Sequence, residues 1–245
     1  MTRVAVFGAR GRMGSEVCRA VDGAGDLELV AGVDLDDDRS AAEAAEVVVD
    51  FTSPDAVMDN LNWCVSRGIS AVVGTTGFSD HRLDEVRALL SGTSVGVLVA
   101  ANFSIGAVLM MHFAVQAAPF YESVEIVELH HPGKVDAPSG TASSTAERVV
   151  AARQASSLPA PPDATRHEAP GARGADVSGV RVHSVRLRGL VAHQEVLFGT
   201  EGETLTVRHD SLDRASFMPG VLAGIRAVRS RPGLTVGIDA ILGIV

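Results

Sequence analysis

The stretch that decides the fold is Val4-Ala5-Val6-Phe7-Gly8-Ala9-Arg10-Gly11-Arg12-Met13-Gly14, close to the start of the chain. Its first four residues predict a short buried strand, and residues 12–21 predict a helix. Glycines between a strand and a helix let the backbone turn tightly and approach a pyrophosphate, which free N–H groups at the helix N-terminus can bind. The spacing G-x-x-G-x-x-G differs by one residue from the commoner dinucleotide fingerprint. Because any tight turn favours glycine, the loop alone is weak evidence for a dinucleotide.

Asp34 strengthens this prediction. It ends a predicted strand over residues 27–33 and lies 34 − 14 = 20 residues beyond Gly14, where an acidic side chain binds the ribose hydroxyls of a dinucleotide. Asp34 favours the diol of NADH, whereas the guanidinium groups of Arg10 and Arg12 suit the 2′-phosphate of NADPH. We therefore predict a site that uses both NADH and NADPH. A structural turn followed by an exposed aspartate is the alternative.

The first hundred residues alternate between strand-like and helix-like segments, which predicts βαβ units and a parallel sheet. The further strands are expected over 47–51, 71–73 and 95–99, and the helices over 54–67, capped by Ser53, and 79–90, capped by Ser79. Two turns, Gly74-Thr75-Thr76-Gly77 and Ala100-Ala101-Asn102-Phe103, follow later strands at their C-termini, where an open α/β sheet binds its ligand. We interpret these turns as the nicotinamide side of the site, with plain loops as the alternative.

After Phe103 the pattern becomes that of an α+β domain. The expected elements are a helix over 105–120, a strand over 124–129, a helix from Ser139 past Val150, a loop over 155–179, antiparallel strands over 180–190, 194–198 and 204–208, a helix over 216–229 and a strand over 234–238. The last two elements are expected to return to the first domain. We predict an α/β fold: a Rossmann-like doubly wound parallel sheet of residues 1–104 plus 215–245, with a second domain over 105–214. The long loop is a candidate lid.

The most informative stretch is residues 128–141, ELHHPGKVDAPSGT. It places His130, His131 and Lys134 between a predicted strand and a predicted helix, in a chain with a formal net charge of −9. Residues 139–141 open that helix, whose N-terminus attracts anions through its dipole and its free N–H groups. Histidine can donate a proton at neutral pH, and lysine can bind or polarise an anionic group. The segment predicts a carboxylate pocket with a titratable acid beside it; a solvated lysine and a simple helix cap are the alternative.

Composition excludes several other classes of protein. The negative net charge would repel a phosphate backbone, so we expect no nucleic-acid partner. Two cysteines, Cys18 and Cys64, give no disulfide framework, which is typical of a reducing cytoplasm. We find no signal-peptide pattern and no apolar run of roughly 20 residues, so we expect a cytoplasmic protein that does not span a membrane. Adjacent histidines point to opposite sides of a strand and no set of cysteines accompanies them, so we expect no metal site.

Together these motifs resemble the 4-hydroxy-tetrahydrodipicolinate reductase (dihydrodipicolinate reductase) family over nearly the whole chain. Further similarity lies in Val49-Asp50-Phe51-Thr52, in Asn102-Phe103-Ser104-Ile105-Gly106 and in residues 189–214. The resemblance implies NAD(P)H-dependent reduction of 4-hydroxy-tetrahydrodipicolinate to tetrahydrodipicolinate, with loss of water, in lysine and diaminopimelate biosynthesis. Two alternatives remain open: another small-substrate dehydrogenase on the same plan, and a non-catalytic nucleotide sensor.

The resemblance also implies residue roles. His130 and Lys134 would be catalytic, and the small dicarboxylate substrate would be bound by His131, Lys134, Ser139, Gly140 and Thr141. The dinucleotide would be contacted by Gly8, Ala9, Arg10, Gly11, Arg12, Met13, Asp34, Gly74, Thr75, Thr76, Ala100, Ala101, Asn102 and Phe103. The second domain would bind substrate and assemble a homo-oligomer, as a tetramer. The chain departs from many members at Gly133, where they carry another basic residue, and at Ala101, where they carry proline.

Overall fold

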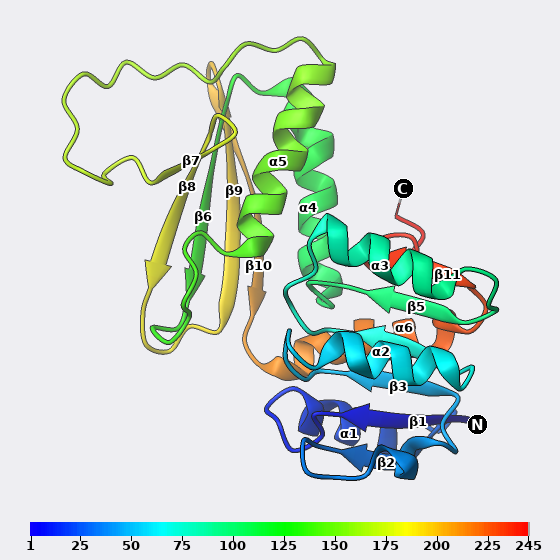
Figure 1. Cartoon of the computed structure of the whole chain (residues 1–245). Coiled ribbons are helices and arrows are strands. Elements are labelled where there is room, and N and C mark those ends of the chain that lie inside the picture. Colours follow the sequence, from blue (N-terminus) through cyan, green and yellow to red (C-terminus); the bar gives the residue numbers. More distant parts are fainter. Residues whose placement is uncertain (245) are drawn as a thin grey trace. The chain divides into compact units, whose positions relative to one another are not determined.

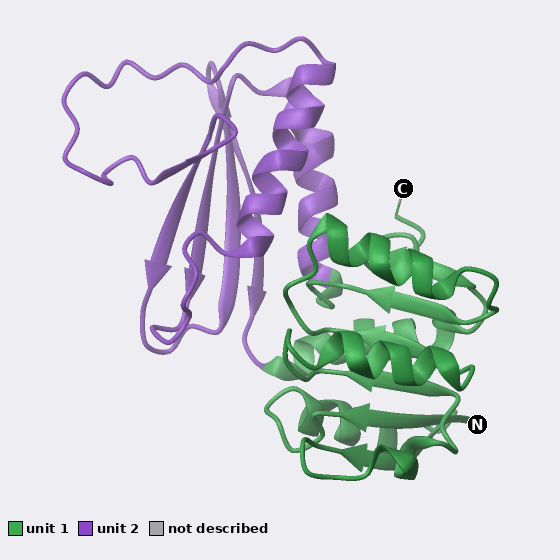
Figure 2. Cartoon of the chain, viewed as in Figure 1, with its two compact units in different colours: residues 1–105, 214–245 green, residues 106–213 purple. Residues whose placement is uncertain are grey.

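The computed structural model of the protein describes residues 1–244, which form two compact units (Figure 2). Unit 1 comprises residues 1–105 and the C-terminal segment from Arg214, and unit 2 comprises residues 106–213. The domain boundaries expected from the sequence lie one residue away from these. The functional roles of the two units remain predictions.

Unit 1 is a six-stranded, all-parallel sheet with strand order β2-β1-β3-β4-β5-β11. Its elements are β1 (Thr2–Phe7), α1 (Gly14–Asp22), β2 (Leu27–Val33), a short 3-10 helix (Arg39–Ala42), β3 (Val47–Asp50), α2 (Val57–Ser66), β4 (Ser70–Val73), α3 (Asp80–Leu90), β5 (Gly96–Val99), a second 3-10 helix (Arg214–Phe217), α6 (Met218–Val228) and β11 (Gly233–Val236). Figure 1 shows α2 and α3 on one side of the sheet and α1 and α6 on the other. The fold is therefore the predicted doubly wound α/β sheet.

Alternation along the central strands explains why helices cover both faces of this sheet. Val73 and Val97 pack with α2 and α3 in one apolar cluster. Val72 and Leu98, one position away on each strand, face Gly224 of α6. Every residue of β3, β4 and β5 is buried, as expected for parallel strands covered on both faces.

The carboxyl ends of these strands meet along one edge of unit 1. The first residue after each strand donates its backbone N–H to the last residue of the neighbouring strand: Gly8 to Val33, Phe51 to Phe7, Gly74 to Asp50 and Ala100 to Val73. The chain runs from β1 to β2 on one side and then crosses to β3 on the other side of β1. The edge between β1 and β3 is thus a topological switch point, where open α/β sheets bind ligands.

Unit 2 contains a five-stranded mixed sheet with order β10-β9-β6-β8-β7. Its elements are α4 (Ile105–Ala117), a 3-10 turn (Ala118–Phe120), β6 (Ser123–His130), α5 (Gly140–Ala155), β7 (Ala175–Val177), β8 (Val180–Arg186), β9 (Ala192–Thr200) and β10 (Glu203–Ser211). The helices α4 and α5 pack on one face of the sheet, where Val124 and Ile126 of β6 join their apolar side chains. Because strand residues alternate between faces, Glu128 and His130 lie on this same face and Glu125 lies on the opposite one.

Three expectations about local structure were wrong. Ser53 does not cap α2, which begins at Val57 without a side-chain cap, because a turn over residues 54–56 precedes it. The expected loop over residues 155–179 is shorter, since α5 extends to Ala155 and β7 occupies 175–177. Of the three strands expected to be antiparallel, β9 and β10 do pair antiparallel, but β8 pairs in parallel with β6 and does not pair with β9, because β6 lies between them. By contrast, Ser79 caps α3 with its side chain, as predicted, and the Ser139 side chain caps α5 in the same way.

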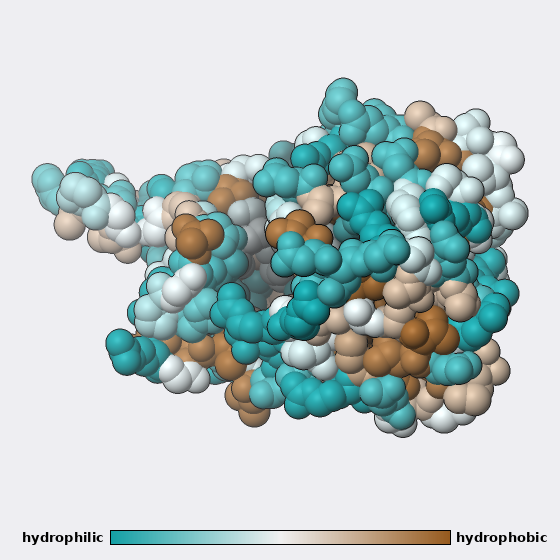
Figure 3. Space-filling model, turned by 60° about the horizontal axis from the view of Figure 1, so that its bottom comes forward, coloured by the Kyte–Doolittle hydropathy of each residue, from teal (hydrophilic) through white to brown (hydrophobic). Residues whose placement is uncertain are grey.

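The surface carries scattered apolar side chains. On the face drawn in Figure 3, hydrophobic residues form small groups separated by hydrophilic ones. Among residues 1–244, no helix is both long enough and apolar enough to cross a membrane.

Candidate functional site

The glycine-rich loop after β1 is held in a shape that only glycine permits at two positions. Gly8 has φ +76°, and a Cβ there would lie 2.7 Å from the carbonyl oxygen of Phe51. A Cβ on Gly14 would lie 2.0 Å from the carbonyl oxygen of Gly8. The loop therefore closes tightly on itself and on β3. The backbone N–H groups of Arg12 and Met13, at the start of α1, donate to no group within residues 1–244, so they could receive a phosphate.

Asp34 lies against this loop and holds it. Its carboxylate accepts the backbone N–H of Arg10 at 2.7 Å, and its own N–H donates to Asp37 at 2.8 Å. The Arg10 guanidinium lies 3.4 Å from Asp34 and 3.1 Å from Asp37. Arg10, expected to reach a 2′-phosphate, is thus paired with two carboxylates, whereas Arg12 is exposed.

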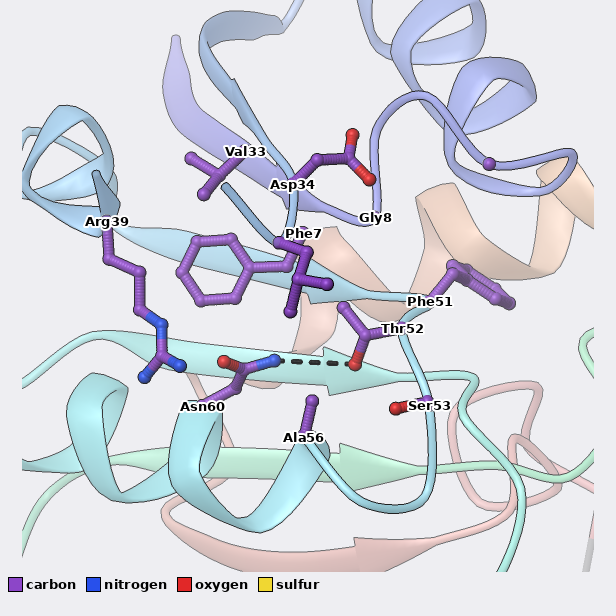
Figure 4. A pocket seen from close by; sticks show the side chains of 12 residues that line it. Phe7, Gly8, Val33, Asp34, Arg39, Phe51, Thr52, Ser53, Ala56 and Asn60 are labelled. Atoms are coloured by element: carbon purple, nitrogen blue, oxygen red, sulfur yellow. Dashed lines mark hydrogen bonds between the residues drawn. The ribbon is translucent and has the colours of Figure 1, made fainter. Parts of the chain in front are cut away.

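A cavity of about 330 Å³ opens at the switch point between β1 and β3. Of the residues predicted to contact a dinucleotide, Gly8, Gly11 and Asp34 line it. Figure 4 shows Asp34 on one side and the Arg39 side chain extending along another, with the Phe7 ring between them and Thr52 hydrogen-bonded to Asn60 on the far side. Prediction from the sequence missed nine lining residues: Phe7, Val33, Leu35, Arg39, Phe51, Thr52, Ser53, Ala56 and Asn60. The quoted motif over residues 49–52 was the available signal, since it follows a buried strand in the same way as the glycine loop does.

A buried carboxylate shapes the wall of this cavity. Asp50 is 1% exposed and accepts four hydrogen bonds at 2.7–3.0 Å: from the backbone and hydroxyl of Thr52, from the Thr75 hydroxyl and from the Asn60 amide. These bonds join the loops after β3 and β4. Thr75, one of the predicted cofactor residues, therefore has its hydroxyl turned toward Asp50. Gly74 is also required for packing, because a Cβ there would lie 2.0 Å from the Phe51 ring.

The remaining predicted cofactor residues lie along the same edge of unit 1 but do not line the cavity. Ala100 and Phe103 are buried, and the Phe103 ring packs 5.9 Å from the Phe51 ring between centroids. Thr76 and Ala101 are exposed, and Asn102 accepts the N–H of Ser104 at 2.8 Å. The structure thus places these residues after β4 and β5, beside the cavity rather than in it.

His130, the predicted acid, ends β6 in unit 2 and is hydrogen-bonded to a neighbour that the sequence prediction left without a role. Its Nδ1 lies 2.5 Å from Oε2 of Glu128, which is fully buried. Glu128 also accepts two bonds from Arg186 of β8, each at 2.8 Å, and the backbone N–H of Ser139 at 3.2 Å. Burial lowers the pKa of His130 below its ordinary value of 6.5, although Glu128 opposes this effect. Burial acts to raise the pKa of Glu128, but hydrogen bonds from Arg186, Ser184 and His130 outweigh it and hold that pKa below 4.5.

Lys134 and the start of α5 complete a polar group beside His130. The chain contains 21 − 1 = 20 arginines and a single lysine, and that lysine is Lys134. Its ammonium lies 2.7 Å from the carboxylate of Asp136. Ser139 is buried and caps α5, whereas Gly140 is exposed and His131 and Thr141 are half-buried. All the residues predicted to act on the substrate thus lie within one short segment, which Glu128 and Arg186 support from β6 and β8.

The loop over residues 156–174, the candidate lid, is anchored on the face of the unit 2 sheet that α4 and α5 do not cover. Arg173, near its end, binds Glu125 of β6 and lies 3.3 Å from Asp163 within the loop. Because Glu125 points away from the helix-covered face, this anchor does not bring the loop over His130. Within residues 1–244 no group of three or more His, Cys, Asp or Glu side chains could hold a metal ion.

Comparison with known proteins agrees with both units. Residues 2–103 match the family Dihydrodipicolinate reductase, N-terminus, and residues 106–242 match Dihydrodipicolinate reductase, C-terminus. The 4-hydroxy-tetrahydrodipicolinate reductases of Cutibacterium acnes and Thermobifida fusca are 67% and 63% identical to the chain, each over 100% of both sequences.

Solved structures give the same result. A dipicolinate-bound dihydrodipicolinate reductase from Paenisporosarcina sp. TG-14 is 38% identical, with a TM-score of 0.86 over 98% of this chain and 99% of that chain. A probable dehydrogenase from Thermotoga maritima, 12% identical with a TM-score of 0.63 over 99% of this chain and 93% of that chain, shares the fold alone. The chain therefore belongs to the dihydrodipicolinate reductase family.

Proposed function

We propose that the chain is an NAD(P)H-dependent 4-hydroxy-tetrahydrodipicolinate reductase, which forms tetrahydrodipicolinate with loss of water in lysine and diaminopimelate biosynthesis. Full-length relatives that are 58–67% identical bear this name. The observation that supports the chemistry best is the group formed by His130, Lys134 and the start of α5. It combines a titratable imidazole and an ammonium with a helix N-terminus that attracts anions.

The residues of unit 1 fit a dinucleotide. The glycine loop packs too closely for any Cβ at Gly14, and the unbonded N–H groups of Arg12 and Met13 suit a pyrophosphate. The cavity of about 330 Å³ has the size of a small-ligand site, and Asp34 offers a carboxylate to the ribose hydroxyls. When bound, the reduced nicotinamide supplies the hydride. Among the predicted contacts, Gly8, Gly11 and Asp34 would hold the adenosine half, and the loops after β4 and β5 would hold the other half.

The polar segment of unit 2 fits a small dicarboxylate. Lys134, the exposed start of α5 at Gly140, and His131 would bind its carboxylates, with Ser139 and Thr141 shaping that helix start. Hydride addition to the conjugated ring leaves negative charge that a proton must neutralise, and His130 and Lys134 would deliver that proton. Holding the ring in place contributes several kcal/mol in such reactions. The Lys134 ammonium already binds a carboxylate, that of Asp136 at 2.7 Å, which illustrates the kind of partner it accepts.

The oligomeric state and the compartment are further parts of this proposal. The family resemblance is the basis for proposing a homotetramer assembled through unit 2 and a cytoplasmic location. A different dehydrogenase activity is the second candidate, because enzymes of several specificities share the fold at 12–16% identity.

The test is oxidation of NADH and NADPH in the presence of substrate that the preceding synthase generates in the assay. We expect oxidation that depends on the synthase and falls at least 10²-fold in His130→Ala and in Lys134→Ala, since positioned proton transfer contributes about 10²- to 10⁴-fold. Binding of NADH, followed by its fluorescence, should be unchanged in both variants. Bound NADH without synthase-dependent oxidation in the wild type would refute the proposed reaction.

A further inference from the structure

We propose that Glu128 is a positioning residue for this reaction: its buried carboxylate sets the orientation and tautomer of His130 and ties that ring to the start of α5. The proposal rests on the proposed function, because it concerns the same group of residues around His130. Glu128 is fully buried, so it acts through His130 rather than on the substrate. Neither the glycine-loop pattern nor the basic motif assigns it a role.

The hydrogen bonds of Glu128 decide which nitrogen of His130 carries the proton. A carboxylate that accepts two N–H bonds from Arg186 and one from Ser139 is ionised and has no proton to donate. The 2.5 Å contact with Nδ1 of His130 therefore requires a hydrogen on Nδ1. Nε2 of His130 bonds to no group within residues 1–244, which leaves it free to exchange a proton with the substrate.

Among the charges around His130, the Glu128 carboxylate is the one that raises the pKa of this ring. Arg186 from β8 and Lys134 from the loop after β6 both disfavour the imidazolium, as burial does, and Glu128 alone favours it. The charge of Lys134 is partly balanced by Asp136. The other groups packed nearby are the half-buried His131 and the neutral Gln194 of β9, which lies opposite Glu128 in the sheet. Removal of the Glu128 charge therefore lowers the pKa of His130 further.

The same carboxylate also locates the anion-binding helix. The Ser139 N–H donates to one Glu128 oxygen, and the Ser139 hydroxyl accepts the N–H of Ala142 in the first turn of α5. A second link lies beside it, since the Gln194 amide donates to Thr145 of α5 at 2.8 Å. Glu128 is thus the side chain that bonds both to the proton-transferring ring and to the first residues of the segment proposed to hold the substrate.

A purely structural ion pair is the competing explanation, and the chain supplies a matched control for it. Glu125, on the opposite face of β6, also binds a histidine and an arginine: His183 at 2.7 Å and Arg173. Glu125→Gln removes the same charge from the same strand, but on the face of the sheet opposite to His130. The two variants therefore separate loss of an ion pair from loss of positioning.

The first experiment compares Glu128→Gln and Glu125→Gln in the full-length enzyme. We expect Glu128→Gln to lower kcat about 10²-fold with a smaller change in KM, because proton transfer is impaired. The limb of the kcat/KM pH profile that reports protonation of His130 should lie below pH 6.5 in the wild type and move lower still in Glu128→Gln. Glu125→Gln should leave both kcat and that limb unchanged. An unchanged kcat or an unmoved limb in Glu128→Gln overturns the proposal.

Nitrogen-15 NMR of the histidine rings gives a readout that needs no turnover, with His130→Asn to assign the signals. The wild type should show His130 with hydrogen on Nδ1, and Glu128→Gln should show a mixture of tautomers. If Glu128→Gln does not fold, Glu128→Asp keeps the charge but shortens the side chain by one carbon, and it should also lose the Nδ1 preference. A wild-type tautomer in the variant that folds contradicts the positioning role. Wild-type enzyme that shows the Nδ1–H tautomer but does not oxidise NADH refutes the proposed reaction instead.

Discussion

At the scale of single residues, position 134 differs from every other position because it carries the one lysine of the sequence. The chain carries positive charge on 20 arginines and uses lysine only at position 134. Arginine remains protonated at any physiological pH, whereas lysine is a compact cation that can give up its proton. The proposed function therefore assigns the single lysine the role of a proton donor as well as that of a positive charge.

Lys134→Arg tests this distinction. We expect the variant to retain binding of dipicolinate within about tenfold, because the positive charge remains, while kcat falls about 10²-fold through loss of the titratable amine. Calorimetric titration with dipicolinate and steady-state rates measure the two effects separately. Full activity in Lys134→Arg would assign Lys134 to binding alone.

The presence of an arginine at position 10 does not by itself predict a preference for NADPH. It was expected to meet a 2′-phosphate, but its side chain is paired with Asp34 and Asp37. The NADPH phosphate would therefore approach two carboxylates before it gained a cation.

Asp34→Asn is expected to shift preference toward NADPH. The amide keeps the shape and can still accept the Arg10 N–H, but it removes a negative charge and weakens the bond to the ribose diol. We expect the ratio of the NADH dissociation constant to that of NADPH to rise about tenfold, which is about 1.4 kcal/mol. Titration of both cofactors by fluorescence measures this ratio; equal changes in the two constants would show that Asp34 does not select between them.

At the scale of elements, aliphatic continuity predicted the strands of unit 1 because they are covered on both faces. The start of α2 was not predictable in this way. The turn before it is held by Arg82 of α3, whose guanidinium donates to the carbonyl of Pro54 at 3.0 Å. A contact between residues so distant in the chain leaves no local pattern.

In the candidate site, too, contacts between residues that are distant in the chain could not be predicted. Residues 128–141 are contiguous, so the predicted grouping of His130, Lys134 and Ser139 followed from their spacing. Arg186, which pairs with Glu128, lies 58 residues away and reaches it only because β8 inserts beside β6 in parallel. The sequence could not show that pairing, so it also gave no indication of the role that we propose for Glu128.

The loop between β1 and α1 gives a sharp test at this scale. Gly14→Ala places a Cβ 2.0 Å from a carbonyl oxygen, so the backbone must move. We expect loss of NADH binding and a destabilisation of about 1–3 kcal/mol, measured by urea unfolding. Gly25→Ala is the matched control, because a Cβ there meets nothing within 4 Å and should leave both quantities unchanged.

The loop over residues 156–174 offers a second test. Arg173 connects it to β6 through Glu125, whereas Arg166 in the same loop is exposed. Arg173→Ala should make the loop markedly more sensitive to limited digestion with subtilisin, and Arg166→Ala should not. If substrate analogue and NADH together protected the loop in the wild type, it would act as a lid despite this anchor.

At the scale of the whole molecule, stability should fall in acid. Burial lowers the pKa of His130, and hydrogen bonds that outweigh burial lower the pKa values of Glu125 and Glu128. A lowered folded pKa gives stability that is present above the unfolded value and is lost as pH falls. The losses should therefore begin below pH 6.5 for the histidine and below about 4.5 for the carboxylates.

Urea unfolding followed by circular dichroism between pH 7 and pH 4 measures this trend. Each proton taken up on unfolding contributes a slope of about 1.4 kcal/mol per pH unit. Glu125→Gln should flatten the part below pH 4.5, because it removes one of the groups responsible. Stability that stayed constant over the whole range would contradict these pKa directions.

The return of β11 to unit 1 also has a consequence for synthesis on the ribosome. Unit 2 is continuous in the chain, but unit 1 is not, and β5 lacks its outer partner until residues 233–236 are translated. At about 5–20 residues per second, the nascent chain carries this gap for on the order of ten seconds. During that time the apolar strand Gly96–Val99 is an open sheet edge that can pair with other chains. A nascent chain with this order of synthesis is therefore a natural client for chaperones that bind exposed strands before translation ends.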